Sequence, residues 1–176
     1  MLMNFFFILS FIFMSNFIVF DFNEQSSAKQ WKVVDDVVMG GVSSSNIFIN
    51  ENGNGVFSGH VSTKNNGGFS SVRHQFKTID ISKFDSFLIR VKGDGKNYQF
   101  RVKSKLNQYY SYKFTFNTTK DWQVIEVPFE KLQATFRGRL LEMPHFTNKE
   151  MEEICFLISN KEEEDFSLLI DYIKLQ

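Results

Sequence analysis

The residue types that most often catalyse reactions or bind metals are sparse and scattered in this sequence. His60, His74 and His145 lie far from one another along the chain, and none has the short spacing typical of a zinc site. The acidic run 162–165 is most simply a solvated turn between strands, and no nucleophile-elbow pattern occurs. A hydrolase or oxidoreductase site built from His60, His74 and this run is therefore the least favoured alternative. We predict a protein that is not an enzyme, with no catalytic residues, no metal site and no cofactor.

Two glycine-rich segments carry a more unusual pattern. Residues 65–73 run from an Asn- and Gly-rich turn into a strand. In residues 31–45, a Gly-Gly pair is followed by hydroxyl side chains, which suits a loop whose backbone turns sharply or approaches another chain closely, with serines bonding the freed amides. The alternative is a purely structural loop that closes one end of the fold, because Gly-Gly alone is a weak signal.

An arginine in the second segment predicts an ion pair. A period of two places Phe69, Ser71 and Arg73 on one face of a strand. Since an arginine on an apolar face needs a partner, Asp35 or Asp36 is the natural candidate. If that pair is buried, removing one side costs about 3–5 kcal/mol, because the other charge is left without compensation.

Composition limits the classes of protein that this chain can be. The chain has 176 residues, of which 43% are hydrophobic and 22 are Phe, so it can bury the core of one domain. Its 20 basic and 20 acidic residues give a formal net charge of +0, which removes the long-range electrostatic argument for a nucleic-acid partner. Cys155 is the only cysteine, so no intrachain disulfide can form.

Short stretches of alternating apolar and polar residues dominate the chain, for example over 98–103, 110–116 and 166–172. Each is as long as a strand with one buried face, and Gly- or Asn-rich turns separate them. Thr147 and Glu150 have the spacing of a capping box, which predicts a short helix continuing through residues 151–154. We therefore predict an all-β sandwich with one or two short helices.

The N-terminus is apolar over residues 1–16, which predicts a signal peptide or an uncleaved anchor ahead of a single domain over 17–176. The chain is then exported or membrane-tethered, and it contacts a membrane only through this segment. The alternative is that these residues pack inside the domain. An Arg-rich mitochondrial presequence is not visible.

The aromatic residues allow a second kind of binding function. Trp31, Trp122 and the tyrosines can line a sugar-binding face, because flat aromatic surfaces stack on pyranose rings. The alternative is that these side chains are core, as aromatics at strand period mostly are.

Several motifs, in the same order along the chain, resemble the complex I intermediate-associated protein family of the thirty-kilodalton type. The signatures are Asp-x-Val-Met-Gly-Gly-x-Ser over 36–43 and Gly-Gly-Phe-x-Ser-x-Arg over 67–73, which are fairly specific in combination. The resemblance extends from about Phe20 to the C-terminus. Further matching stretches are residues 31–35, 57–59, 90–98, 109–116, 121–129 and 166–175.

This resemblance implies a galactose-binding-like jelly roll, no catalysis, and a chaperone-like role in assembling respiratory complex I. The expected partner is a protein, either a respiratory complex subunit or an assembly intermediate. The alternative is a carbohydrate-binding module of the galactose-binding-like type, with a glycan as ligand. By match to the two signatures, the binding residues are Asp36, Met39, Gly40, Gly41, Ser43, Gly67, Gly68, Phe69, Ser71 and Arg73.

Overall fold

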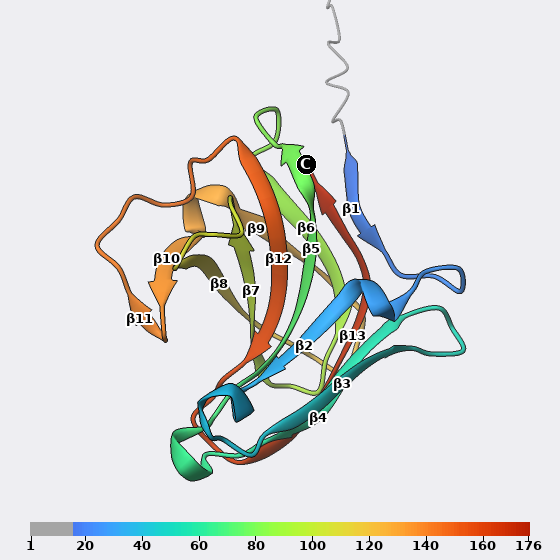
Figure 1. The fold of residues 1–176 in the computed structure, drawn as a ribbon. Helices are drawn as coiled ribbons and strands as arrows, with labels where there is room; N and C mark the ends of the chain where they lie inside the picture. Colours follow the sequence, from blue (N-terminus) through green and yellow to red (C-terminus); the bar gives the residue numbers. More distant parts are fainter. Residues whose placement is uncertain (1–15) are drawn as a thin grey trace, which may run out of the picture.

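The segments with alternating apolar residues form strands, which pair into two antiparallel sheets (Figure 1). The computed structural model describes residues 16–176, so the predicted signal or anchor segment, residues 1–16, lies almost entirely outside the described part. In β7 (Asn97–Lys103), Tyr98, Phe100 and Val102 are buried, whereas the intervening side chains point to the other face of the sheet. The predicted all-β jelly-roll sandwich is confirmed.

One sheet has six strands in the order β3-β4-β13-β6-β9, with β1 pairing against β13 as well. Because β13 is 12 residues long, β4 pairs with its first half and β1 with its second half. The strands of this sheet are β1 (Phe17–Asp21), β3 (Ser44–Ile49), β4 (Gly55–Val61), β6 (Ser86–Lys92), β9 (Gln123–Pro128) and β13 (Glu164–Leu175).

The second sheet has seven strands in the order β11-β10-β8-β7-β12-β5-β2. All pairings described are antiparallel. The other strands of this sheet are β2 (Trp31–Asp35), β5 (Ser70–Asp80), β8 (Ser111–Asn117), β10 (Gln133–Phe136), β11 (Arg139–Leu140) and β12 (Glu150–Ile158).

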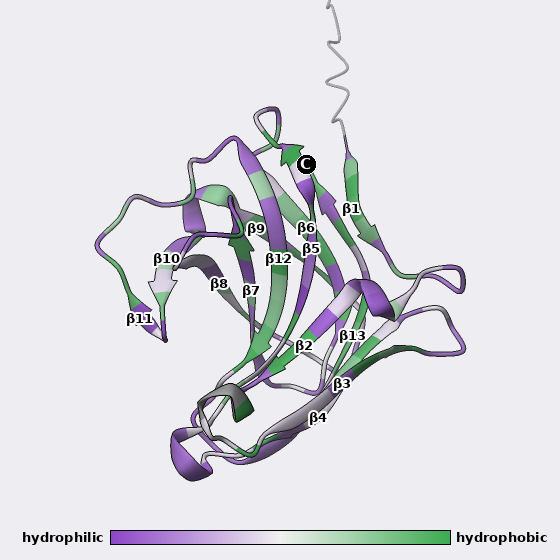
Figure 2. Cartoon of the chain, in the orientation of Figure 1, coloured by the Kyte–Doolittle hydropathy of each residue, from purple (hydrophilic) through white to green (hydrophobic). Residues whose placement is uncertain are grey.

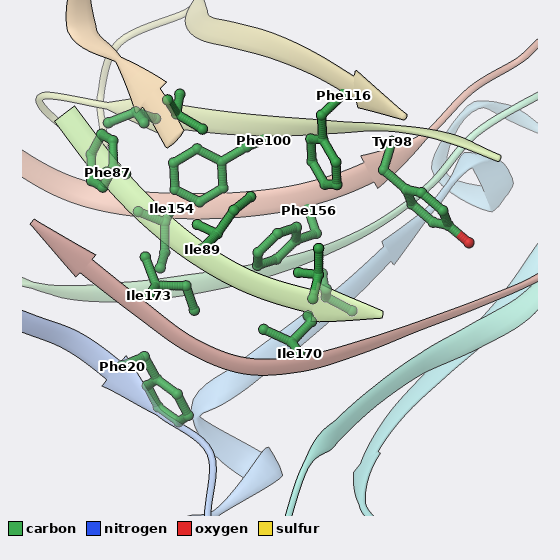
Figure 3. Close-up of a cluster of buried hydrophobic side chains, with 14 of the residues drawn as sticks. Phe20, Phe87, Ile89, Tyr98, Phe100, Phe116, Ile154, Phe156, Ile170 and Ile173 are labelled. Atoms are coloured by element: carbon green, nitrogen blue, oxygen red, sulfur yellow. The ribbon is translucent and has the colours of Figure 1, made fainter. Parts of the chain in front are cut away.

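The core lies between the two sheets and is rich in phenylalanine (Figure 3). Phe87 of one sheet packs against Phe100 of the other with ring centroids 5.0 Å apart, and Phe100 packs in turn against Phe156. All three side chains are fully buried. Burial of a side chain of this size contributes about 1.5–3 kcal/mol, so this aromatic layer is a main source of stability.

The predicted helix after Thr147 is wrong, because residues 150–158 form strand β12. The capping-box spacing is present, but the run from Ile154 to Ile158 is buried on both faces, and β5 and β7 pair with it on either side. Figure 2 shows that β12 is hydrophobic along most of its length. A strand at the centre of a sheet is thus favoured over an isolated helical turn.

Helical structure in residues 16–176 is limited to short 3-10 turns, and α-helices are absent from this part of the chain. None of the turns is long and apolar enough to cross a membrane. The four turns are η1 (Ala28–Gln30), η2 (Asp36–Met39), η3 (Lys64–Asn66) and η4 (Phe129–Lys131).

Candidate functional site

The two glycine-rich signatures meet at one end of the sandwich. The first begins in η2, directly after β2, and the second follows η3 and leads into β5. Figure 1 shows these two turns side by side at the bottom of the molecule. Gly40 ends η2 with φ of 90°, a left-handed conformation that glycine adopts without strain. The chain therefore reverses here and returns toward β3.

The side chain of Asp36 holds the two loops together. Its carboxylate accepts hydrogen bonds from the Ser43 amide at 3.0 Å and the Ser43 hydroxyl at 2.5 Å within the first loop. It also accepts from the amides of Gly68 at 2.6 Å and Phe69 at 3.3 Å in the second loop. Asp36 is only 1% exposed, so these four donors replace the water that a carboxylate otherwise needs. We call this arrangement the Asp36 junction.

The ionised form of Asp36 is favoured in the folded protein. Burial by itself opposes ionisation, but the hydrogen bond from the Ser43 hydroxyl and those from the amides of Gly68, Ser43 and Phe69 outweigh it. The pKa of Asp36 therefore lies below the ordinary value of an aspartate. The junction contains a buried negative charge that is stabilised entirely by dipolar groups.

Two of the signature glycines are required by close approach to Asp36. A Cβ atom at Gly41 would overlap the carboxylate, and one at Gly67 would lie 2.5 Å from Oδ2. The Gly41 amide also donates to the Asp36 carbonyl at 3.1 Å. At both positions the group that comes close to the glycine backbone is a side chain of this same chain, and the expected approach of the loop to another chain stays a prediction.

The predicted ion pair between Arg73 and Asp35 or Asp36 is wrong. Asp35 accepts hydrogen bonds from the Ser45 amide, the Ser45 hydroxyl and the Ser70 hydroxyl, at 3.0, 2.8 and 2.6 Å. Both aspartates are thus satisfied by serines and amides. Arg73 lies farther along β5, on the face of the seven-stranded sheet that is turned away from the core.

A pocket of about 360 Å³ lies on this outer face, next to the second loop. Gly67, Phe69 and Arg73 line it from the loop and β5. Arg101 of β7 and the exposed ring of Tyr109 line it farther across the sheet. The second signature therefore contributes to two features at once, because its amides bind Asp36 and its side chains border the pocket.

Sequence reasoning missed three pocket residues outside the signatures, Arg101, Lys103 and Phe136. Period two correctly places Arg101 and Lys103 on the face opposite Phe100. That pattern does not tell which strands lie beside β7. It therefore gave no reason to expect that these cations line a pocket and are not simply exposed to solvent.

Burial separates the ten predicted binding residues into two groups. Five are buried, namely Asp36, Gly41, Ser43, Gly68 and Ser71. Gly40 is exposed, and Gly67, Phe69 and Arg73 are half-buried beside the pocket. Met39 is the last residue of η2. Among the predicted residues whose burial is described, the accessible ones are thus Gly40 and the three half-buried residues at the pocket.

The histidines of the least favoured alternative do not share a site. His60 lies on β4 and contacts Asp165 at 2.8 Å through Nδ1, whereas His74 lies on β5 in the other sheet. His74 contacts the Gln30 carbonyl at 3.0 Å and stacks on Trp31, and burial lowers its pKa. In the described part of the chain, no three His, Cys, Asp or Glu side chains form a cluster suited to a metal ion.

The two tryptophans do not form an exposed sugar-binding face. Trp31 is 4% exposed and packs against Phe20, Phe22 and His74. Trp122 lies under the guanidinium of Arg90, with the carbon of that group 4.5 Å from the ring centroid. Among the aromatic residues considered from the sequence, Tyr109 and Tyr110 border the pocket, and Tyr109 is 66% exposed.

Comparison with known proteins gives both a family and a fold. The family model "Complex I intermediate-associated protein 30 (CIA30)" matches residues 20–170. The probable complex I intermediate-associated protein 30, mitochondrial, of Caenorhabditis elegans is 27% identical over 175 residues, covering 86% of this chain and 52% of that protein. The mouse protein, complex I intermediate-associated protein 30, mitochondrial, is 26% identical over 182 residues, covering 89% and 55%. The chain thus spans about half the length of these relatives.

Among solved structures, a similar one is the family 11 carbohydrate-binding module from Clostridium thermocellum in complex with a β-1,3-1,4-mixed-linked tetrasaccharide. Its TM-score is 0.68 at 18% identity, and the match covers 91% of this chain and 94% of that module. At this level of identity the likeness concerns the fold.

Proposed function

Because the chain belongs to the complex I intermediate-associated protein 30 family, we propose that it is a non-catalytic protein-binding module that acts in the assembly of a protein complex. The expected partner is a respiratory complex subunit or an assembly intermediate. The observation that carries this proposal is the Asp36 junction, which fixes both signature loops in one rigid end of the sandwich. Loops held on a rigid scaffold are where binding residues are most often found.

The junction keeps apolar side chains exposed beside it. Val37 is 60% exposed and Val42 is 51% exposed, although Asp36, Gly41 and Ser43 next to them are buried. A partner that covers these valines gains the burial of apolar surface. It also avoids the cost of ordering a flexible loop, because the loop is already held by the hydrogen bonds of Asp36.

The state of Asp36 supports binding over catalysis. Four donors occupy its carboxylate oxygens, and the side chain is closed to solvent. A general base or a metal ligand needs free lone pairs that face the reacting group. The carboxylate of Asp36 therefore fixes the conformation of the two loops and cannot contact a substrate.

Affinity purification of the tagged full chain from its native host, followed by mass spectrometry, tests this proposal. Val37→Asp and Val42→Asp each place a charge on the exposed surface of the first loop. Val124→Asp is the matched control, because Val124 is 52% exposed but lies on β9 of the six-stranded sheet. We expect a protein partner that the wild type and the control retain and that the two loop variants lose.

All variants should have the circular dichroism spectrum and melting temperature of the wild type, so that loss of the partner reports on binding and not on misfolding. Equal recovery of the partner with the loop variants would show that this end of the sandwich is not the binding surface. Recovery of no protein partner by the wild type would count against a protein-binding function altogether.

A second candidate is a carbohydrate-binding module, which is favoured by the pocket beside the exposed ring of Tyr109. Calorimetric titration with mixed-linked β-glucan oligosaccharides tests it directly. The pocket is also lined by Arg73 and Arg101. These charges argue against a neutral glycan as the ligand, because a neutral sugar does not compensate them. No heat of binding at millimolar ligand would remove this candidate.

For location, we propose that the apolar residues 1–16 export or tether the chain. Strand β1 begins at Phe17, so cleavage next to Asn16 would leave every residue of that strand in place. N-terminal sequencing of the mature protein and cell fractionation test this. Since both relatives described above are mitochondrial by name, recovery of the protein inside mitochondria is the result that would contradict export.

A further inference from the structure

A row of positive side chains crosses the outer face of the seven-stranded sheet. Strand register places Lys32 beside Arg73, Arg73 beside Cys155, Cys155 beside Arg101, and Arg101 beside Lys113. The row thus crosses β2, β5, β12, β7 and β8 in their order within the sheet. With strands about 4.8 Å apart, Arg73 and Lys113 are separated by about 14 Å. We call Lys32, Arg73, Arg101 and Lys113 the cation row.

The cation row is not neutralised by this protein. Among the ion pairs of residues 16–176, none involves a member of the row. Glu153 lies in the neighbouring row of the sheet, where it accepts a hydrogen bond from Gln75 at 2.6 Å. Nε of Arg73 is buried without a hydrogen-bond partner, and Arg101 donates to the neutral amide oxygen of Gln99.

The half-buried position of Arg73, Arg101 and Lys113 is unfavourable in the unbound protein, whereas Lys32 at the end of the row is exposed. Burial lowers the pKa of Arg101, and the nearby charge of Arg73 lowers it further, although Cys155 acts in the opposite direction. Burial and the charge of Arg101 likewise lower the pKa of Lys113. Like charges gathered in a partly desolvated place are stabilised when an anion joins them.

An aromatic edge borders the row on the side of β10. The rings of Tyr109 and Phe136 pack edge to face with centroids 5.3 Å apart, and both side chains are exposed. The guanidinium carbon of Arg137 lies 5.3 Å from the centroid of the Phe136 ring. A ligand that crosses the pocket thus meets cations along the sheet and an apolar patch at the edge.

We propose that the cation row binds an acidic, extended segment of a partner protein, with carboxylates at alternate positions on Arg73, Arg101 and Lys113. In an extended peptide, side chains on one face repeat about every 6.7 Å, so three alternate residues span about 13 Å. This length matches the distance between Arg73 and Lys113. Arginine side chains bind carboxylates through two parallel hydrogen bonds, and an apolar residue beyond the acids would cover Tyr109 and Phe136. The proposal rests on the protein-binding function proposed above.

The shape of the site favours a peptide over other polyanions. The rings of Tyr109, Tyr110 and Phe136 are inclined to one another by 72° and 82°, so they do not form a flat platform for successive sugar rings. Nucleic-acid binding is typical of a surface with a broad excess of positive charge, whereas the whole chain has a net charge of +0. The charges of this site are confined to one face of one sheet.

Fluorescence anisotropy with the purified protein tests this directly. The probe is a labelled peptide with three glutamates at alternate positions followed by a tyrosine, and the control peptide has glutamine in place of each glutamate. We expect the glutamate peptide alone to bind, and we expect binding to weaken as salt is raised. Arg101→Gln and Lys113→Gln should each weaken binding roughly tenfold, as expected for loss of one charge-assisted hydrogen bond. Lys120→Gln, an exposed lysine between β8 and β9, is the control with the same change in charge.

Several results would overturn this inference. One is equal binding of the glutamine peptide, and another is unchanged binding by both row variants. Tighter binding of a single-stranded DNA oligonucleotide or an oligogalacturonate than of the peptide would assign the site to another polyanion. If Arg101→Gln lowers the melting temperature markedly, Lys113→Gln, which is nearer the edge of the sheet, decides the test.

The two proposals fail in distinguishable ways. If the Val37 and Val42 variants lose the cellular partner while the row variants keep it and bind no acidic peptide, the protein-binding function stands and the acidic-segment inference falls. If the wild type captures no protein partner, the protein-binding function falls, whatever the peptide does.

Discussion

Replacing Asp36 by alanine is the sharpest test of the structural role assigned to the junction. The change removes an acceptor shared by donors from both loops, one of which, the Gly68 amide, lies 32 positions along the chain from Asp36. The Ser43 hydroxyl can still donate to the Ser62 carbonyl, 3.3 Å away. The amides of Ser43 and Gly68 have no such replacement, because their bonds to Asp36 are buried.

The magnitude follows from these two amides. Leaving a buried donor unpaired costs about 1–3 kcal/mol, so Asp36→Ala should lower the free energy of unfolding by about 2–6 kcal/mol. The amide of Phe69 is only partly buried and its bond is long, at 3.3 Å, so it adds little. A loss of this size is a large part of the 5–15 kcal/mol that holds a typical domain together.

Urea unfolding followed by tryptophan fluorescence measures the change. Asp165→Ala is the control, because it also removes a bonded aspartate, but one whose side chain is 91% exposed beside His60. We expect the control to leave the midpoint almost unchanged. A shift below about 1 kcal/mol for Asp36→Ala would refute the conclusion that this carboxylate holds the loops together.

Three further predictions concern the same end of the fold and the outer face of the sheet. Because the pKa of Asp36 is depressed in the folded state, its ionised form stabilises the fold above the unfolded pKa of about 3.9. The stability difference between wild type and Asp36→Asn should therefore be constant near neutral pH and shrink as pH falls through the folded pKa; a constant difference down to strongly acidic pH would contradict this. Gly41→Ala should lower the urea midpoint more than Gly40→Asn, since a Cβ atom at Gly41 overlaps Asp36 whereas one at Gly40 meets nothing within 4 Å, and the reverse order would be inconsistent with the junction. Burial raises the pKa of Cys155 to about 11, so iodoacetamide should label this thiol in urea but not in the native protein, as followed by mass spectrometry.

The strands were largely predictable because each carries its own signal. Alternation in residues 98–103 identified β7 and its buried face, since a strand with one face in the core must alternate. The same logic failed at residues 150–158, where a capping-box pattern pointed to a helix. β12 is buried on both faces near its end, so it has no alternation to reveal it.

The candidate site was only partly predictable. The binding role of the signature residues stays a prediction, whereas the structure shows that the Asp36 side chain lies close to the backbone at Gly41 and Gly67. The partner of Arg73 was predicted wrongly, because Asp35 or Asp36 was expected to pair with it, whereas Asp36 binds the amides of the other loop. Hydrogen bonds between loops that are distant along the chain leave no pattern within either loop.

The sequence by itself determined the sheet-forming segments, the turns between them, the phenylalanine-rich core and the family signatures, because these depend on local propensity and on apolar periodicity. Only the tertiary structure decided that Arg73, Arg101 and Lys113 lie in one row and that Asp36 joins the two loops. The physical reason is that the net charge of +0 averages over the whole chain, whereas an electrostatic site depends on which strands are neighbours. Strand order and register arise from the packing of the whole sheet, and no single strand encodes them.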